Sequence, residues 1–363
     1  MSKSSRLKIA FVIDDLGFGG AQRQLSILVE ALSHTADPRV FCLSQTTEPF
    51  AGGIRGAGVE VVVVPRSRAF ELRRVARLTR AFVEQEIDVV HGFLDAANVY
   101  AWAAARRARV PCVLSLRNER LRLRGFRRLL LRYSLRHTDF VIANSQAGKR
   151  FLTVGLSLRR DRVSVVPNAV VVPDPPAPDA PPNPALIGFV GRLRRQKRID
   201  LLVDAFAAAL PRLKDAKLVL AGEGPEWQTV TDRARHHGVA GHVHLAGFVQ
   251  DVADLMREFS CLALPSAYEG LPNVALEAIA MGVPVVAADV GDVREIVLDG
   301  QTGYLWKGTT AESLADLIVR AATDGALRKR VAVEGPALAR SKYGVEASVG
   351  ELMGVYEKVT VGR

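Results

Sequence analysis

The sequence is poor in cysteine and contains no long apolar run. Its three cysteines, Cys42, Cys112 and Cys261, are scattered among 363 residues without CxxC spacing, so neither a disulfide framework nor a zinc site is predicted. No uncharged apolar stretch approaches the ~20 residues that a transmembrane helix needs. The apolar run from Ile9 to Ile13 is too short for a signal peptide. We therefore expect a cytosolic protein with buried reduced thiols, or one that sits peripherally on the inner face of a membrane.

Acidic residues are scarce in the first half of the chain. Residues 1–172 carry 28 Lys and Arg but only 14 Asp and Glu, whereas the remaining residues carry 21 and 24. The whole chain has 48% hydrophobic and 24% charged residues, as ordinary soluble globular proteins do, and its length predicts two domains. The basic half predicts a domain that meets an anionic partner.

Proline marks the predicted domain boundary. Seven prolines fall within the fifteen residues from Val171 to Ala185, which excludes regular helix or central strand and is typical of a stiff, extended connector. A surface loop within one domain is the alternative. We predict an N-terminal domain over residues 1–172, a linker over 173–185, a C-terminal domain over 186–342, and a helix over 343–363 that returns to the N-terminal domain.

Short Val, Ile and Leu runs alternate with helical periodicity on both sides of the linker. Such runs predict parallel strands buried on both faces, and hence one α/β doubly wound sheet in each domain. The predicted strands are Leu7–Ile13, Val40–Leu43, Val59–Val64, Asp88–Val90, Cys112–Leu116, Phe140–Ala143 and Val163–Val166, followed by Leu186–Val190, Lys217–Ala221, Val243–Leu245, Cys261–Leu264 and Val285–Ala287. In such sheets ligands bind beyond the carboxyl ends of the strands.

A glycine cluster follows the first predicted strand. It reads Gly17-Phe18-Gly19-Gly20-Ala21-Gln22, and glycines there let backbone N–H groups approach a phosphate or sugar at a helix N-terminus. A dinucleotide fingerprint would have a third glycine where the chain has Gln22, which argues against a dehydrogenase. A tight turn without ligand remains an alternative.

Two cations follow the first strand after the linker. Arg192 stands at the end of that strand, and Lys197 stands just before a predicted helix from Ile199 to Leu210. Fixed positive charges at a strand end are suited to a diphosphate whose negative charge develops as it leaves. A solvated basic loop is the alternative, and it describes Arg194, Arg195 and Arg198 well.

Two glutamates eight positions apart form a third candidate motif. Glu269 lies in a loop, and Glu277 lies inside the helix that follows it. Pro272 suits a first helical turn, so the N–H groups of Asn273 and Val274 can face a phosphate. We expect Glu269 to accept sugar hydroxyls and Glu277 to hold a ribose.

At this point the sequence resembles retaining glycosyltransferases of the family 4 type. The resemblance rests on Gly20-Ala21-Gln22, on the GRL…K stretch from Gly191 to Lys197, and on EGLPNVALEAIAMGVPVVA from Glu269 to Ala287. It implies the GT-B fold, with two Rossmann-like doubly wound domains facing across a cleft, and no cofactor. Arg198 departs from the pattern, because glycine commonly follows the lysine, and it would add charge near the phosphates.

The resemblance also implies roles for individual residues. Arg192 and Lys197 would bind the donor diphosphate, Glu269 the transferred sugar and Glu277 the ribose. His91, which ends a predicted strand, would hydrogen-bond a sugar hydroxyl, with a structural histidine as the alternative. The remaining donor-binding positions would be Gly19, Gly20, Gly222, Gly224, Phe248, Gly270, Leu271, Pro272, Asn273 and Val274.

Two missing motifs narrow the chemistry. No D-x-D triplet occurs, so we expect cationic side chains, and not a metal ion, to bind the diphosphate. No GxxxxGK[ST] occurs, which excludes a P-loop nucleotidase. The resemblance, together with the basic N-terminal half, implies transfer of a sugar, with UDP as the favoured nucleotide, to a saccharide or lipid-linked acceptor in envelope polysaccharide synthesis. The alternatives are a nucleotide-sugar epimerase or phosphorylase of the same fold, and a regulatory protein that binds nucleotide sugars.

Arginine is concentrated between Arg117 and Arg136. Eight arginines lie there among Leu, Phe and Tyr. A solvated helix face is one interpretation, and attachment to an anionic membrane surface is the second. Nucleic-acid binding ranks last, because few aromatic residues are placed to stack on bases, so we expect no nucleic-acid partner.

Overall fold

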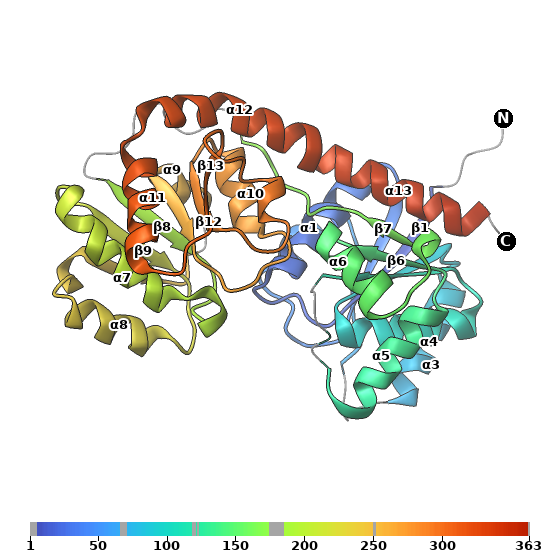
Figure 1. Ribbon diagram of the computed structural model, residues 1–363. Coiled ribbons are helices and arrows are strands. Elements are labelled where there is room, and N and C mark those ends of the chain that lie inside the picture. The colour runs from blue at the N-terminus through green and yellow to red at the C-terminus, as the bar shows by residue number, and fades with distance from the viewer. Residues whose placement is uncertain are drawn as a thin grey trace. The chain divides into compact units, whose positions relative to one another are not determined.

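The computed structural model describes residues 6–65, 71–117, 121, 123–173, 185–249 and 252–361. Its internal contacts divide the chain into two units (Figure 1). Unit 1 consists of residues 1–169 and 345–363, and unit 2 of residues 170–344. Apart from Pro173 and Ala185, the predicted linker lies outside the described residues, so its stiffness stays a prediction.

Unit 1 contains a seven-stranded parallel sheet with the strand order β3-β2-β1-β4-β5-β6-β7. The strands are β1 (Lys8–Ile13), β2 (Asp37–Cys42), β3 (Val61–Val63), β4 (Val89–Phe93), β5 (Cys112–Leu116), β6 (Phe140–Ala143) and β7 (Val163–Val165). The helices are α1 (Gly20–Leu32), α2 (Phe50–Gly56), α3 (Leu72–Glu84), α4 (Asp95–Ala108), α5 (Gly125–His137), α6 (Gln146–Arg150) and α13 (Val345–Val361), with a π-helical turn over Phe151–Gly155.

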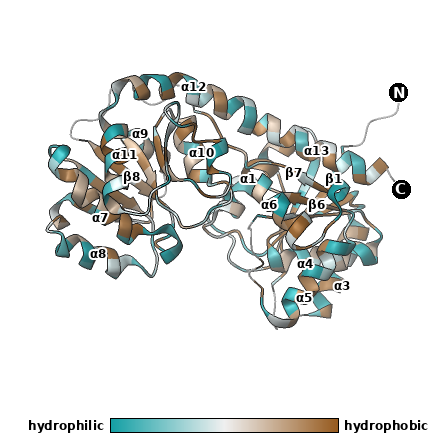
Figure 2. Cartoon of the chain, viewed as in Figure 1, coloured by the Kyte–Doolittle hydropathy of each residue, from teal (hydrophilic) through white to brown (hydrophobic). Residues whose placement is uncertain are grey.

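Helices cover both faces of this sheet, because its strands are apolar on both sides. Alternate strand residues such as Val12 and Val90 pack against α3, α4 and α5. Their neighbours, such as Phe11 and Val89, pack against α1, α2 and α13. The described helix after unit 2 therefore supplies part of the unit 1 core, and Figure 2 shows hydrophobic and hydrophilic residues mixed along the covering helices.

Unit 2 contains a six-stranded parallel sheet with the order β10-β9-β8-β11-β12-β13. The strands are β8 (Leu186–Val190), β9 (Lys217–Ala221), β10 (Val243–Gly247), β11 (Cys261–Leu264), β12 (Val285–Ala288) and β13 (Gly303–Trp306). The helices are α7 (Ile199–Ala209), α8 (Trp227–His236), α9 (Val252–Arg257), α10 (Asn273–Ala280), α11 (Ala311–Thr323) and α12 (Gly325–Tyr343). The two doubly wound sheets confirm the predicted fold class, and β13 is a strand that the sequence analysis missed.

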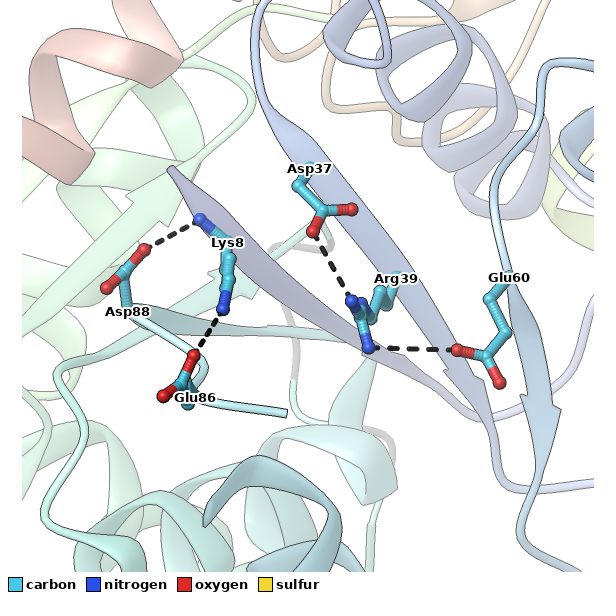
Figure 3. Close-up of polar contacts among 6 residues, drawn as sticks. All are labelled: Lys8, Asp37, Arg39, Glu60, Glu86 and Asp88. Carbon is cyan, nitrogen blue, oxygen red and sulfur yellow. Dashed lines mark hydrogen bonds and ion pairs between the residues drawn. The ribbon is translucent and has the colours of Figure 1, made fainter. Parts of the chain in front are cut away.

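Charged pairs lie at the N-terminal ends of the unit 1 strands (Figure 3). The Lys8 backbone N–H donates to Asp88 at 2.8 Å, and its ammonium group donates to Glu86 at 2.7 Å. Arg39 pairs with Asp37 at 3.3 Å and lies 3.9 Å from Glu60. Exposed pairs of this kind contribute about 0–1 kcal/mol each. They lie at the N-terminal ends of the strands, whereas ligands of doubly wound folds bind beyond the carboxyl ends.

Two further features concern the described residues. No helix among them is long and apolar enough to cross a membrane. Cys42, Cys112 and Cys261 are buried and none forms a disulfide, as predicted.

Candidate functional site

The strand order of unit 2 reverses between β8 and β11, which are hydrogen-bonded neighbours. In doubly wound sheets a ligand binds beyond the carboxyl ends of the strands at such a reversal. The loops that follow β8 and β11 are joined here, since Ala267 N–H donates to the Gln196 carbonyl at 2.8 Å and Gln196 Nε2 donates to the Tyr268 carbonyl at 2.8 Å. The loops that carry the predicted diphosphate and sugar residues therefore form one connected structure.

Lys197 and Glu269 meet between these two loops. Lys197 ends a short 3-10 turn after β8, and its Nζ lies 2.5 Å from Oε1 of Glu269. The side chains are 18% and 12% exposed. An enclosed ion pair keeps more of its Coulomb attraction than a surface pair, because less water screens it. The structure thus brings together the lysine predicted to bind the diphosphate and the glutamate predicted to bind the sugar.

The arginines around Lys197 lie in different environments. Arg192, Arg194 and Arg195 are exposed, with Arg192 two residues beyond the end of β8. Arg198 has a left-handed backbone conformation, with φ 51° and ψ 48°, and its guanidinium carbon lies 5.2 Å from the centroid of the Trp306 ring. Glycine adopts that conformation without strain. The charge of Arg198, which we expected near the phosphates, is therefore directed to an aromatic ring.

Glycine is required where the loops after β8 and β9 touch. Gly222 has a φ of 139°, and a Cβ atom there would collide with the Gly191 carbonyl. A Cβ atom on Gly224 would collide with the Leu193 carbonyl, and Leu193 N–H donates to the Glu223 carbonyl at 2.9 Å. These glycines hold the β8 loop against the β9 loop, and this close packing explains both of them without a ligand.

The segment after Glu269 leads into α10. Pro272 is the residue before the helix, and Asn273 and Val274 form its first turn, where backbone N–H groups have no intrahelical acceptor. Gly270 and Glu277 are partly exposed, Leu271 is buried, and the Gly270 carbonyl accepts from Asp292 N–H at 3.2 Å. Phe248, directly after β10, is 48% exposed. Only Gly270, Leu271 and Pro272 therefore separate Glu269 from the start of α10.

The glycine cluster of unit 1 follows β1, where the strand order of that sheet reverses. Asp15 Oδ1 accepts from Gly17 N–H and from Gln22 Nε2, both at 3.0 Å. The Gln22 side chain lies where a Cβ atom on Gly19 would collide with it, and α1 begins at Gly20. Asp15 and Gln22 thus shape the predicted phosphate loop, and the sequence analysis did not assign this role to either.

Asp14, the neighbour of Asp15, was also missed. Its Oδ1 accepts a hydrogen bond of 2.5 Å from Ala97 N–H in the first turn of α4. Burial, and to a lesser degree the charges of Asp95 and Asp15, raises the pKa of Asp14 to about 6. The two acidic residues directly after the first strand were the available signal.

His91 lies in the interior of unit 1. It is 1% exposed, its Nδ1 lies 2.6 Å from the Tyr356 hydroxyl of α13, and its Nε2 lies 2.7 Å from Ser115 Oγ of β5. Burial and the nearby charge of Arg117 lower its pKa, so the ring stays neutral. This geometry favours the structural alternative over a contact with a sugar hydroxyl, because both ring nitrogens already have partners.

Comparison with known proteins identifies the family. The family model described as glycosyl transferases group 1 matches residues 174–337, and the glycosyl transferase 4-like domain matches residues 19–169. A putative glycosyltransferase of Bacillus subtilis, EpsF, is 28% identical and covers 97% of each chain. The D-inositol 3-phosphate glycosyltransferase of Nocardiopsis dassonvillei is 32% identical over 76% of this chain and 71% of its own.

Solved structures agree on the fold. HepE of Anabaena, solved in complex with UDP-glucose, superimposes with a TM-score of 0.85 over 97% of this chain and all of its own, at 22% identity. The sucrose-phosphate synthase of Thermosynechococcus elongatus gives a TM-score of 0.79 over 98% of this chain and all of its own, at 18% identity. Because a relative above 30% identity spans most of the chain and family models match both units, the chain belongs to the family 4-type glycosyltransferases with the GT-B fold.

Proposed function

We propose that the chain is a retaining glycosyltransferase that moves a sugar from a nucleotide-diphosphate sugar to an acceptor hydroxyl. The observation that carries this proposal is the enclosed Lys197–Glu269 pair at the strand-order reversal of unit 2. A lysine ammonium has three donors, so Lys197 can keep Glu269 and bind a phosphate oxygen as well. Glu269 then has a second oxygen for a sugar hydroxyl.

The departing diphosphate is the group that the enzyme must stabilise in the transition state. Negative charge grows on it as the bond to the sugar breaks, and preorganised positive groups lower the barrier. Lys197, Arg192 and the first-turn N–H groups of α10 are the groups proposed for this task, and Glu277 is proposed to hold the ribose. The acceptor hydroxyl attacks on the face that the nucleotide leaves, so the anomeric configuration is retained. His91 is not part of this step, because its nitrogens are bonded in the core.

The relatives favour particular substrates. HepE of Anabaena was solved with UDP-glucose, which supports a UDP-sugar donor. The names of two relatives, a D-inositol 3-phosphate glycosyltransferase and a phosphatidyl-myo-inositol mannosyltransferase, specify compounds that carry a phosphate. We therefore propose a UDP-sugar donor bound by unit 2 and a phosphate-bearing acceptor, such as a lipid-linked saccharide, bound by unit 1.

A thermal-shift panel of nucleotide sugars tests the donor. A ligand at 100 times its Kd raises the stability of the state it binds by about 2.7 kcal/mol. We expect UDP and one UDP-sugar to raise the unfolding temperature, and the Arg194→Ala variant, altered at an exposed arginine of the same loop, to respond equally. No response to any nucleotide sugar would refute the proposal. Incubation with donor alone separates the alternatives, since an epimerase yields an epimer, a phosphorylase with phosphate yields a sugar phosphate, and a regulatory protein yields nothing.

We also propose that α5 attaches the protein to an anionic membrane surface. Phe126, Leu129 and Tyr133 are 70%, 63% and 51% exposed, and their spacing places them along one side of the helix. Arg127 and Arg128 are exposed beside them. An exposed apolar stripe between arginines is suited to an interface of lipid tails and phosphates. A helix face that only contacts water would not account for these exposed apolar side chains.

Vesicle co-sedimentation tests this attachment. We expect the full chain to bind vesicles that contain phosphatidylglycerol at low salt and not vesicles of phosphatidylcholine alone. Replacing Phe126 and Leu129 together by Ser should abolish binding, and replacing Arg127 and Arg128 together by Gln should weaken it. Val333→Ser, at an apolar residue of α12 that is 73% exposed, is the control and should bind as the wild type does. Equal binding to both kinds of vesicle, or to neither, would contradict the proposal.

A further inference from the structure

Arg117 occupies an unusual position for a charged residue. It directly follows β5, at the carboxyl edge of the unit 1 sheet, and it is only partly exposed. Burial lowers its pKa to about 10, which leaves it positively charged at neutral pH. A buried charge costs stability unless a group of opposite sign is near, so the neighbours of Arg117 decide what it can do.

Those neighbours are neutral among the residues that the structure describes. The Arg117 Nη2 donates to Asn168 Oδ1 at 2.5 Å, and the guanidinium carbon lies 5.0 Å from the centroid of the Phe93 ring. Within the described ranges, no carboxylate forms an ion pair with Arg117 and no second acceptor is bonded to its guanidinium. Because a guanidinium has five N–H donors in a planar fork, this leaves donors for a ligand.

The contrast with the rest of unit 1 is informative. At the opposite edge of the sheet, Lys8 and Arg39 have carboxylate partners (Figure 3). At the carboxyl edge, Asp14 and Asp15 bond to backbone N–H groups of Ala97 and Gly17, not to Arg117. The positive charge of Arg117 reaches as far as His91, whose pKa it helps to lower.

The support around Arg117 is firmly held. Asn168 is 4% exposed, and its Oδ1 also lies 3.4 Å from Nδ2 of Asn144, which is 8% exposed. The next residue, Ala169, exchanges two hydrogen bonds with Gln24 of α1, at 2.6 and 2.7 Å. Fixed neighbours hold the guanidinium in one orientation before any ligand arrives, which is what tight oxyanion binding requires.

We propose that Arg117, supported by Asn168 and Phe93, binds an oxyanion of the acceptor, a phosphate or a carboxylate, at the carboxyl edge of the unit 1 sheet. The proposal rests on the proposed function, which makes unit 1 the acceptor-binding unit. An arginine fork binds such a group through two parallel hydrogen bonds. The incoming anion compensates the buried charge, so acceptors with this group are preferred over neutral ones.

Anion titration in the presence of saturating UDP tests the proposal. UDP fills the proposed diphosphate site of unit 2, so inorganic phosphate is left to report on unit 1, and the unfolding temperature is followed as phosphate is added. We expect Arg117→Gln to raise the phosphate concentration needed for half of the shift by at least about tenfold, the usual scale for one charge-assisted contact. Arg117→Lys, which keeps the charge without the fork, should raise it by a few-fold. Arg55→Gln, at an exposed arginine of α2, should leave it unchanged.

Further measurements identify the anion that binds and separate failure of this inference from failure of the proposed function. Glycerol 3-phosphate, dihexanoyl phosphatidic acid and lactate distinguish a soluble phosphate, a lipid-borne phosphate and a carboxylate by which of them competes with inorganic phosphate. In the absence of anions, Arg117→Met should unfold at the same or a higher temperature than the wild type, since a buried charge is removed; a purely structural arginine predicts a fall. The inference is overturned if Arg117→Gln binds phosphate as tightly as the wild type does. If Arg117→Gln does not fold, the same comparison is made with Arg117→Lys. An absent UDP response in the wild type would instead overturn the proposed function.

Discussion

Lys197 has one carboxylate partner in the structure and, by our proposal, gains a phosphate when donor binds. Lys197→Ala removes the positive charge and leaves Glu269 without its cation. We expect turnover to fall by roughly 10²–10³, the cost typical of losing one preorganised charge stabiliser, and Arg192→Ala to act in the same direction. Steady-state assays of sugar transfer provide the measurement.

The same loop supplies matched controls for this experiment. Arg194→Ala and Arg195→Ala remove exposed positive charges of the same loop and should keep turnover within a few-fold. If all four variants lose activity equally, the loop acts through its net charge and the specific roles of Lys197 and Arg192 are wrong.

Asp14 gives a pH-dependent prediction at the same scale. Its pKa is about 6 in the folded protein and 3.8 in the reference state, so the folded state binds the proton more tightly. The contribution of Asp14 to stability therefore falls as pH rises from about 4 to about 6. Above that range the protein carries the full cost of keeping the buried Asp14 carboxylate ionised, on the order of 1–3 kcal/mol. Asp14→Asn keeps an acceptor for Ala97 N–H and loses the charge. We expect this variant to be more stable than the wild type at pH 7, with a smaller gain at pH 5, in denaturant unfolding.

The control for this experiment is an exposed carboxylate. Asp161 is paired with Arg159, which lowers its pKa, so Asp161→Asn should not stabilise the protein at pH 7. A gain from Asp14→Asn that is the same at pH 5 and pH 7 would contradict the proposed cause.

At the scale of elements, α10 and α12 are in close backbone contact at Gly335 and Ile279. A Cβ atom on Gly335 of α12 would lie 2.5 Å from the Ile279 carbonyl of α10. Gly335→Ala should therefore cost about 1–3 kcal/mol by overpacking, against a helix-propensity gain of at most about 1 kcal/mol. Since α10 carries Glu277, donor affinity should fall as well. Thermal unfolding and a donor titration measure the two effects.

Gly325 is the matched position in the same helix. A Cβ atom there meets nothing within 4 Å, so Gly325→Ala should leave stability unchanged or raise it by up to about 1 kcal/mol. Equal effects of the two substitutions would show that close packing of α10 and α12 does not matter.

The elements also show what local sequence patterns reveal and what they miss. Twelve predicted strands are present with ends shifted by up to a few residues, because buried parallel strands are continuous Val, Ile and Leu runs. The missed strand, β13, is the four-residue run GYLW, and its glycine is needed for close approach to the Val285 carbonyl. The ring contact of Arg198 and one of the two partners of His91 involve residues more than 100 positions away, Trp306 and Tyr356, which no local pattern indicates. The Lys197–Glu269 meeting was predictable, because both residues follow strands that end at the same edge.

At the scale of the whole molecule, the chain enters unit 2 at Val170 and leaves it at Gly344. These two residues form a parallel β-bridge, and Val170 N–H donates to the Tyr343 carbonyl at 2.8 Å. The following helix, α13, returns to unit 1 and buries Leu352, Val355 and Tyr356 against it. Unit 1 is therefore completed by a segment that follows all of unit 2.

A chain that stops after Gly344 tests this dependence. It lacks the apolar face of α13 and leaves His91 Nδ1 without the Tyr356 hydroxyl, so unit 1 should become sensitive to limited proteolysis while unit 2 stays resistant. Tyr356→Phe in the full chain removes only the hydrogen bond, which costs about 1–3 kcal/mol, and should stay resistant. Equal resistance of unit 1 in the shortened and full chains, read by mass spectrometry of the fragments, would contradict a structural role for α13.

The position of α13 also has a consequence for biosynthesis. Domains generally fold in the order in which the ribosome releases them. Unit 2 can fold as soon as Gly344 has emerged, whereas the α1 side of unit 1 must wait for Val345–Val361 with its apolar surface uncovered. The first half to be translated is thus the second to be finished, and we expect the uncovered apolar surface to make nascent chains prone to aggregation during that interval.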